Sequence, residues 1–252
     1  MTVPPTAQRE PELSDQTVLV IGGSSGIGLE TARRARAEGA NVILTGRDPG
    51  RLKAAADELG ALSTAAFDVT DPAALERFFQ DLPRPVNHVM VTAGGQYYAP
   101  LAEMDFDRAR STLDEHLLLP LYIGRNAIGV VPPGGTLLFM TGTLARRPGV
   151  GNSIAALQSD GLPALIANLA LELAPIRANL IAAGFVDTPL SASLLGTDLD
   201  KRRDQLRATL PIRRVVGPAD VAALAVHIMT NPALTGATYD IDGGEQVLPG
   251  SP

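Results

Sequence analysis

The sequence predicts an α/β fold in which a parallel seven-stranded sheet is doubly wound, with helices on both faces. Two observations carry this prediction. Short apolar runs rich in β-branched residues alternate with helical segments along the whole chain, and the connections between them are short. The 252 residues are 45% hydrophobic, which is enough for one large core.

Seven apolar runs of strand length are bounded by turn residues or polar segments. The predicted strands are Thr17–Ile21, Asn41–Thr45, Ala65–Val69, His88–Thr92, Thr136–Thr141, Ala178–Ala183 and Thr238–Ile241. Helices are expected after Gly28, at Arg51–Leu59, at Pro72–Asp81, within Phe106–Val131, in a segment that ends near Leu173, and at Asp220–Met229. This order predicts a single domain over residues 15–252. Residues 1–14 are polar and rich in proline, and we expect them to form a disordered tail rather than a signal peptide.

Composition excludes several classes of function. The net charge is −6 and the sequence has no basic block, so we expect no nucleic-acid partner and no anionic membrane partner. The absence of cysteine excludes disulfides and thiolate chemistry, and the three histidines do not have the spacing of a metal site. No uninterrupted apolar run reaches the roughly 18 residues of a membrane span. These features predict a cytoplasmic protein that acts on a small molecule.

The turn after the first strand carries the strongest functional signal. Gly22 allows a tight turn, Gly26 allows a pyrophosphate to approach, and Gly28 allows close packing of helix and strand. Free N–H groups at the start of the following helix attract phosphate. A strand, glycine turn and helix in this order predict a dinucleotide site on a Rossmann fold. The residues of the turn expected to contact the cofactor are Gly22, Ser24, Ser25, Gly26, Ile27 and Gly28.

The other candidate positions follow the carboxyl ends of the predicted strands, where ligands bind in such sheets. The segments expected around one crevice are Gly22–Gly28, Gly46-Arg47, Asp68-Val69, Ala93–Gly95 and Thr141–Thr143.

Five of these motifs, in order, resemble the short-chain dehydrogenase/reductase family over nearly all of residues 17–244. They are GGSSGIG, Asp68-Val69, Ala93-Gly94, the segment Leu169–Pro189 and Asp242-Gly243-Gly244. The resemblance implies that Asp68 and Val69 contact adenine, and that Gly184, Val186 and Thr188 face nicotinamide. Departures occur at Ile21, Thr92 and Ala183, where the family usually has Thr, Asn and Pro.

The end of the second strand indicates which cofactor is bound. An acidic residue there would bind the ribose 2′-hydroxyl of NAD. The sequence instead has Gly46, which leaves space, and Arg47, whose guanidinium suits a phosphate. We therefore expect NADP(H) in preference to NAD(H). The alternative is that Arg47 is a surface residue paired with Asp48.

The proton-transfer residues implied by the resemblance are missing. The family uses a Tyr four residues before a Lys, together with a Ser and an Asn. The only lysines here are Lys53 and Lys201, so no Tyr-x-x-x-Lys exists. Counting back from Leu169–Pro175 puts Ala155 at the Tyr position, Ser159 at the Lys position and Gly142 at the Ser position. His116 stands where the family has Asn.

Pro163 interrupts the helix that carries the Tyr and Lys in the family. Either the regular helix begins near Gly161 and leaves residues 149–158 as a loop, or one helix continues through a proline kink. The apolar residues Leu165, Leu169 and Leu173 of this helix are expected to contact a second subunit, in a homodimer or homotetramer.

Several residues are candidates for replacement chemistry. His116 is the first, as a proton donor or relay, because imidazole titrates near neutral pH; the alternative is a packing residue. Thr143 is a candidate hydrogen-bond donor to a substrate oxygen, or else caps a turn. Tyr97 and Tyr98 are candidate proton donors or pocket walls. Further residues that could contact a substrate are Gln158, Ser159, Arg146, Arg147 and the loop Pro189–Pro211.

These observations leave three functions open. The first is an atypical NADP(H)-dependent oxidoreductase that transfers hydride to an imine, an activated double bond or a carbonyl. The second is a catalytically silent cofactor-binding sensor, or the structural partner of an active homologue. The third is a non-redox isomerase or cyclase. The first is favoured because the cofactor crevice is retained.

Overall fold

The computed structural model describes residues 12–143 and 146–248. Its seven strands form one parallel sheet, as predicted, and their order in the sheet is β3-β2-β1-β4-β5-β6-β7. The strands are β1 Thr17–Ile21, β2 Asn41–Gly46, β3 Ser63–Ala66, β4 His88–Val91, β5 Thr136–Gly142, β6 Arg177–Ala183 and β7 Thr238–Ile241. The strand order reverses between β1 and β4, and sheets of this kind bind ligands at that reversal, outside the carboxyl ends of the strands.

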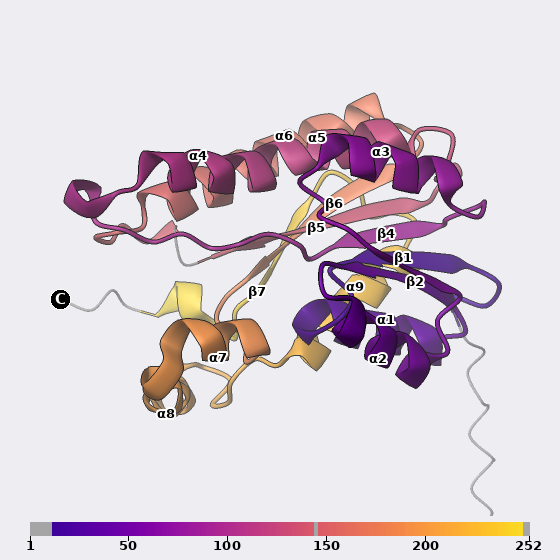
Figure 1. Cartoon of the computed structure of the whole chain (residues 1–252). Coiled ribbons are helices and arrows are strands. Elements are labelled where there is room, and N and C mark those ends of the chain that lie inside the picture. The colour runs from indigo at the N-terminus through magenta and orange to yellow at the C-terminus, as the bar shows by residue number, and fades with distance from the viewer. Residues whose placement is uncertain (1–11, 144–145, 249–252) are drawn as a thin grey trace, which may run out of the picture.

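Helices cover both faces of the sheet (Figure 1). One layer contains α1 Gly26–Ala37, α2 Pro49–Leu59 and α9 Pro218–Thr230. The other contains α3 Pro72–Asp81, α4 Phe106–Leu113, α5 Leu119–Ala127 and α6 Ser153–Glu172. Between α4 and α5 the predicted long helix widens into a π turn, η2, at Asp114–Leu118.

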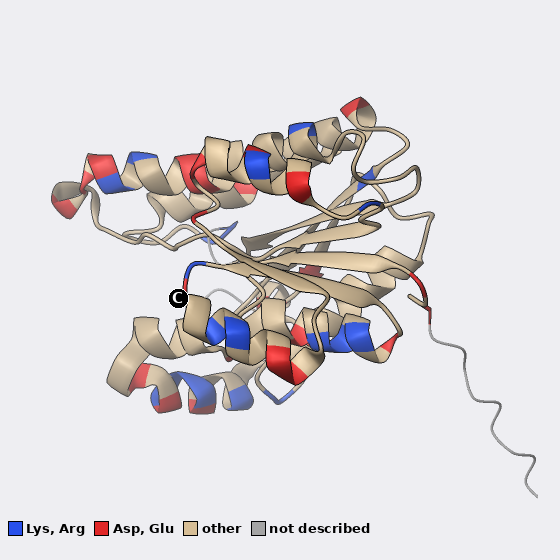
Figure 2. Ribbon diagram, turned by 45° about the vertical axis from the view of Figure 1, so that its right-hand side comes forward, with Lys and Arg blue, Asp and Glu red and all other residues tan. Residues whose placement is uncertain are grey.

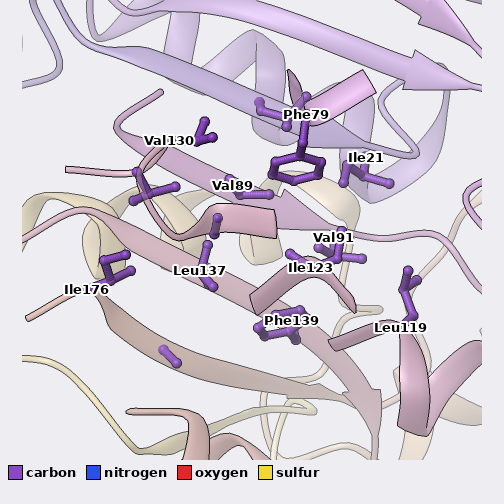
Figure 3. Packing of buried hydrophobic residues seen from close by; sticks show 14 of the residues in the cluster. Ile21, Phe79, Val89, Val91, Leu119, Ile123, Val130, Leu137, Phe139 and Ile176 are labelled. Atoms are coloured by element: carbon purple, nitrogen blue, oxygen red, sulfur yellow. The ribbon is translucent and has the colours of Figure 1, made fainter. Parts of the chain in front are cut away.

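Alternation along the strands divides the core into two clusters. Val18 and Val20 of β1 pack toward the layer of α1, α2 and α9, whereas Leu19 and Ile21 pack toward α3, α5 and α6. Figure 3 shows the second cluster, in which Phe79 of α3 lies against the sheet. A parallel sheet covered on both faces requires such continuously apolar strands.

The predicted domain boundary is wrong by a few residues. Leu13 is fully buried, and its backbone N–H donates to the Glu38 carbonyl at 2.9 Å. The ordered domain therefore includes residues 12–14, which were expected to be part of a disordered tail. The rest of that predicted tail lies outside the described residues.

Helix α6 continues through Pro163 from Ser153 to Glu172, so the alternative of one continuous helix is correct and residues 153–158 are helical. Proline costs about 3 kcal/mol inside a helix. Burial of each large apolar side chain offsets about 1.5–3 kcal/mol, and Leu162, Ile166 and Leu169 are all buried. By length and composition α6 also qualifies as a membrane span. Here it packs on β5 and β6 as a core helix.

The predicted substrate loop contains two helices, α7 Pro189–Leu195 and α8 Leu199–Thr209, joined by a short 3-10 turn. These helices and the C-terminal turn η5, Glu245–Val247, lie together at one end of the sheet (Figure 1). Charged residues are concentrated on the helices and loops, and the strands are almost free of them (Figure 2).

Candidate active site

The turn between β1 and α1 has the geometry of a phosphate cradle. A Cβ on Gly28 would lie 2.3 Å from the Gly22 carbonyl oxygen, so only glycine permits this packing. Gly22 itself has φ +89°. The N-cap residue Ser25 makes no side-chain capping bond, and the first turn of α1 contains no acidic residue. The N–H groups that begin α1 therefore remain available to an anion.

The loop after β6 packs against this turn. The Thr188 side chain lies 3.6 Å from the position of a Cβ on Gly26. Thr188 also begins α7, and its hydroxyl accepts from the Ser191 N–H at 3.2 Å. A Cβ on Gly184 would lie 2.7 Å from the Asp242 Cβ, so this loop is tightly packed on the C-terminal segment. The structure thus brings together the predicted pyrophosphate and nicotinamide positions.

Arg47 lies exposed at the end of β2 and is not paired with Asp48. Asp48 instead caps α2, accepting from the Arg51 N–H at 3.0 Å and from Arg51 Nε at 3.2 Å. Within residues 12–143 and 146–248, no hydrogen bond or ion pair engages the Arg47 guanidinium. The alternative that Arg47 is a partner of Asp48 is therefore wrong, and its guanidinium is available to a ligand.

Asp68 and Val69 follow β3 rather than ending it, because β3 stops at Ala66. The Thr70 N–H and hydroxyl lie 3.0 and 2.8 Å from Asp68 Oδ1. These bonds lower the pKa of the Asp68 carboxyl, and the positive charge of Arg47 lowers it further. Asp68 is thus ionised and held in a turn on the same side of the crevice as Arg47.

His116 lies in the π turn and faces the loop after β4. Its Nδ1 lies 3.0 Å from the Thr112 carbonyl oxygen, which also accepts from Gln158 Nε2 at 3.2 Å. A Cβ on Gly94 would lie 2.9 Å from both Cε1 and Nε2 of His116. Burial lowers the pKa of His116, although the Thr112 bond and the charge of Glu115 oppose this shift. The imidazole is therefore mainly neutral at pH 7.

The two candidate tyrosines differ in their surroundings. Tyr97 is buried against Ala109 and Ile154, and its hydroxyl accepts from the Asp105 N–H at 2.7 Å. These contacts favour a packing role for Tyr97 over the predicted role of proton donor. Tyr98 is half-exposed, and its hydroxyl donates to Gln96 Oε1 at 3.3 Å. Partial burial raises the pKa of Tyr98, which makes it a weaker acid.

The positions expected for Ser, Tyr and Lys lie on β5 and α6. Gly142 ends β5, and among the described residues beyond its chain neighbours the nearest atom to a Cβ there would be the Ala183 carbonyl oxygen, at 3.9 Å. Ala155 and Ser159 are both buried. Thr143 is fully buried, its carbonyl accepts from Gln246 Nε2 at 3.3 Å, and its hydroxyl has no partner in the described part of the chain. Thr143 thus lies beneath the C-terminal turn rather than exposed to a substrate.

Unlike Arg47, the arginines of the segments expected to contact a substrate are engaged by the protein itself. Arg146 pairs with Asp240, and Arg147 donates to the carbonyls of Glu245 and Leu248. In the predicted substrate segment, Arg202 lies 2.9 Å from Glu245, and Arg203 makes a bidentate pair with Asp187. The Arg202–Glu245 contact joins α8 to η5, and the Arg203–Asp187 pair joins α8 to the loop after β6. The contacts of Arg146 and Arg147 leave these two residues poorly suited to hold an anionic substrate.

Comparisons with known proteins agree with this geometry. The model of a family described as enoyl-(acyl carrier protein) reductase matches residues 22–246. The chain is 29% identical to the short-chain dehydrogenase/reductase ATR9 of Stachybotrys chlorohalonatus, covering 93% of this chain and 98% of that protein. It is 29% identical to the 3-oxoacyl-[acyl-carrier-protein] reductase MabA of Mycobacterium tuberculosis, covering 97% and 98%.

The protein belongs to the short-chain dehydrogenase/reductase family. Among solved structures, the MalC reductase/Diels-Alderase of Malbranchea aurantiaca superposes with a TM-score of 0.87 at 25% identity, covering 95% of this chain and 99% of that chain. Membership of the short-chain dehydrogenase/reductases implies an oxidoreductase that uses a nicotinamide cofactor. The uncapped start of α1 and the glycine cradle fit the pyrophosphate of such a cofactor.

Sequence reasoning missed two features of this short-chain dehydrogenase/reductase. The first is the π turn, although Pro120 was a signal because it cannot donate to the His116 carbonyl four residues earlier. The second is the hydrogen bond from Gln158 on α6 to the Thr112 carbonyl, because Gln158 was named only as a candidate contact to substrate. Only packing of α6 on η2 brings these residues together, so no local pattern could have indicated that contact.

Proposed function

We propose that the protein is an NADP(H)-dependent oxidoreductase that transfers hydride to a small organic substrate without the usual Tyr/Lys pair. One observation carries the proposal. The glycine cradle and the exposed Arg47 are intact, whereas buried Ala155 and Ser159 stand where an acid and its lysine are expected. Loss of a general acid costs about 10²–10⁴-fold in rate. A protonated imine or an activated double bond depends least on such an acid.

NADP(H) is proposed over NAD(H) because a 2′-phosphate at the end of β2 would meet Arg47, Ser24 and Gly46. The Ser24 Oγ lies 3.2 Å from the position of a Cβ on Gly46, so a serine hydroxyl borders the space that this glycine leaves. The Asp48 carboxylate is engaged by α2 and Arg51, which offsets its repulsion of a phosphate.

Binding measurements test the cofactor. We expect NADPH to bind more tightly than NADH, and Arg47→Ala to weaken NADPH binding by about 10- to 100-fold, since a charge-assisted hydrogen bond contributes roughly 1.5–3 kcal/mol. NADH affinity should not change. Arg34→Ala removes the same charge from the far end of α1, where Arg34 pairs with Glu38, and serves as the control. An equal loss for both cofactors would contradict the assignment of Arg47.

Turnover measurements test the reaction. NADPH oxidation would be followed by absorbance with cyclic imines, activated alkenes and plain ketones. We expect imines or activated alkenes to be reduced and ketones to react about 10²–10⁴-fold more slowly. Preferential ketone reduction would contradict the proposal. Tight NADPH binding without oxidation of any compound would favour the silent sensor.

A second candidate function is a cyclisation without hydride transfer. It is favoured by the description of MalC as both a reductase and a Diels-Alderase. Product analysis with NADP⁺ bound, which cannot donate hydride, would detect this activity separately from reduction.

We also propose a cytoplasmic homodimer or homotetramer. Leu169 and Leu173, which were expected to contact a second subunit, are buried within the subunit. Leu157 and Leu171, on the outer face of α6, are 56% and 79% exposed and are better candidates for that contact. Light scattering of the purified protein would give the number of subunits.

A further inference from the structure

The π turn and the Thr112 carbonyl determine which nitrogen of His116 carries a proton. A carbonyl oxygen only accepts hydrogen bonds, so Nδ1, 3.0 Å away, must be the donor. A neutral imidazole has one N–H. Nε2 of neutral His116 therefore carries a lone pair and has no proton to give. The prediction that His116 is a proton donor does not fit this arrangement.

The position of Gln158 reinforces that arrangement. Its Nε2 donates to the same Thr112 oxygen at 3.2 Å, so donors from η2 and from α6 hold one carbonyl. Gln158 is 3% exposed, which keeps water from competing for this contact. His116 is thus held at its Nδ1 edge, and its Nε2 edge is turned toward Gly94.

The Nε2 lone pair of His116 lies next to Gly94, and the position of Gly94 in the fold puts it on the nicotinamide side of the dinucleotide site. A dinucleotide straddles the reversal of strand order between β1 and β4. The adenosine half lies toward β2 and β3, where Arg47 and Asp68 are found, and the other half lies toward β4, β5 and β6. Gly94 follows β4 and has a φ of +136°. Because Gly94 has no side chain, the imidazole of His116 can approach its backbone closely.

We propose that His116 binds the nicotinamide-side ribose of the cofactor as a hydrogen-bond acceptor, with a ribose hydroxyl donating to Nε2. This inference rests on the proposed binding of a nicotinamide dinucleotide. It assigns the contact with that ribose to an imidazole lone pair, in a chain whose helix α6 carries no lysine. His116 is accordingly a cofactor-binding residue and supplies no proton to the substrate.

Nitrogen NMR of the full-length protein tests the proposal without turnover. Long-range ¹H–¹⁵N correlations of histidine-labelled protein report which imidazole nitrogen is protonated, and His116→Gln assigns the signals. We expect the Nδ1–H form in the free protein. NADPH and 2′-phospho-ADP-ribose should both shift the Nε2 signal, because both carry the second ribose. The fragment 2′,5′-ADP, which lacks it, should leave that signal unchanged.

Affinities provide the second readout. His116→Phe should weaken NADPH binding by about 2- to 10-fold, which is the range that a neutral hydrogen bond contributes, and should leave 2′,5′-ADP binding unchanged. His227→Phe, at an exposed position on α9, is the matched control. A proton on Nε2 in the free protein, or NADPH binding with no change at His116, overturns the role of His116 alone. Failure of the unsubstituted protein to bind NADPH overturns this role and the proposed function together.

Discussion

Burial and neighbouring groups set the protonation states of individual buried residues in this protein, and His88 is the clearest case. It is 3% exposed at the start of β4, and its Nε2 lies 2.7 Å from Gln16 Oε1. In the part of the chain that the structure describes, its Nδ1 has no partner, and neither has the hydroxyl of Thr136, its neighbour in register on β5. Burial, with a smaller effect from the charge of Arg177, lowers the pKa of His88 to about 3.

This shift predicts loss of stability in mild acid. Since the unfolded chain binds a proton near pH 6.5 and the folded chain near pH 3, the free energy of unfolding falls as the pH drops below 6.5. The slope approaches roughly 1.4 kcal/mol per pH unit. The lowered pKa of His116 adds in the same direction. Denaturant unfolding between pH 4.5 and 7 would measure the slope.

The variant His88→Gln should flatten this dependence, because glutamine does not titrate. His227→Gln, at an exposed position, should leave it unchanged. An identical slope in the His88 variant would show that other groups cause the acid sensitivity.

At the scale of elements, Arg177 joins β6 to the end of α9. Its buried guanidinium has no carboxylate partner among the described residues and donates five hydrogen bonds to backbone carbonyls. The acceptors are Gly134, Ile228, Met229, Asn231 and Leu234, at 2.7–3.1 Å. The last carbonyls of a helix lack intrahelical donors and attract positive charge. Arg177 thus caps α9 and the turn that leads to β7.

Replacement of Arg177 by methionine should therefore be strongly destabilising. We expect the free energy of unfolding to fall by about 3 kcal/mol or more, because several buried carbonyls lose their donors together. Hydrogen exchange should accelerate first at the end of α9. Arg84→Met, which removes a single bond from an exposed side chain to the Gly129 carbonyl, should cost less than about 1 kcal/mol and is the control. Equal losses in the two variants would refute the capping role.

At the scale of the whole molecule, one end of the sheet carries every candidate site segment. The turns after β1, β2, β3, β4 and β6 meet there because parallel strands place their carboxyl ends on the same edge. This end is covered by the helices α7 and α8 and the turn η5. The ion pairs Arg202–Glu245 and Arg203–Asp187 hold α8 in place there.

The sequence by itself determined the seven strands, their parallel arrangement and the glycine turn, because continuous apolar runs, their alternation with helical segments and the φ requirements of Gly22 are local properties of the chain. Only the tertiary structure decided the rest. Helix α6 runs through Pro163 because the core buries the residues on either side of it, and Tyr97 is buried because Ala109 and Ile154 pack against it. His116 presents a lone pair because Thr112 accepts its one proton. Each of these outcomes depends on a contact that packing or a helical turn creates, and residue spacing alone does not encode such contacts.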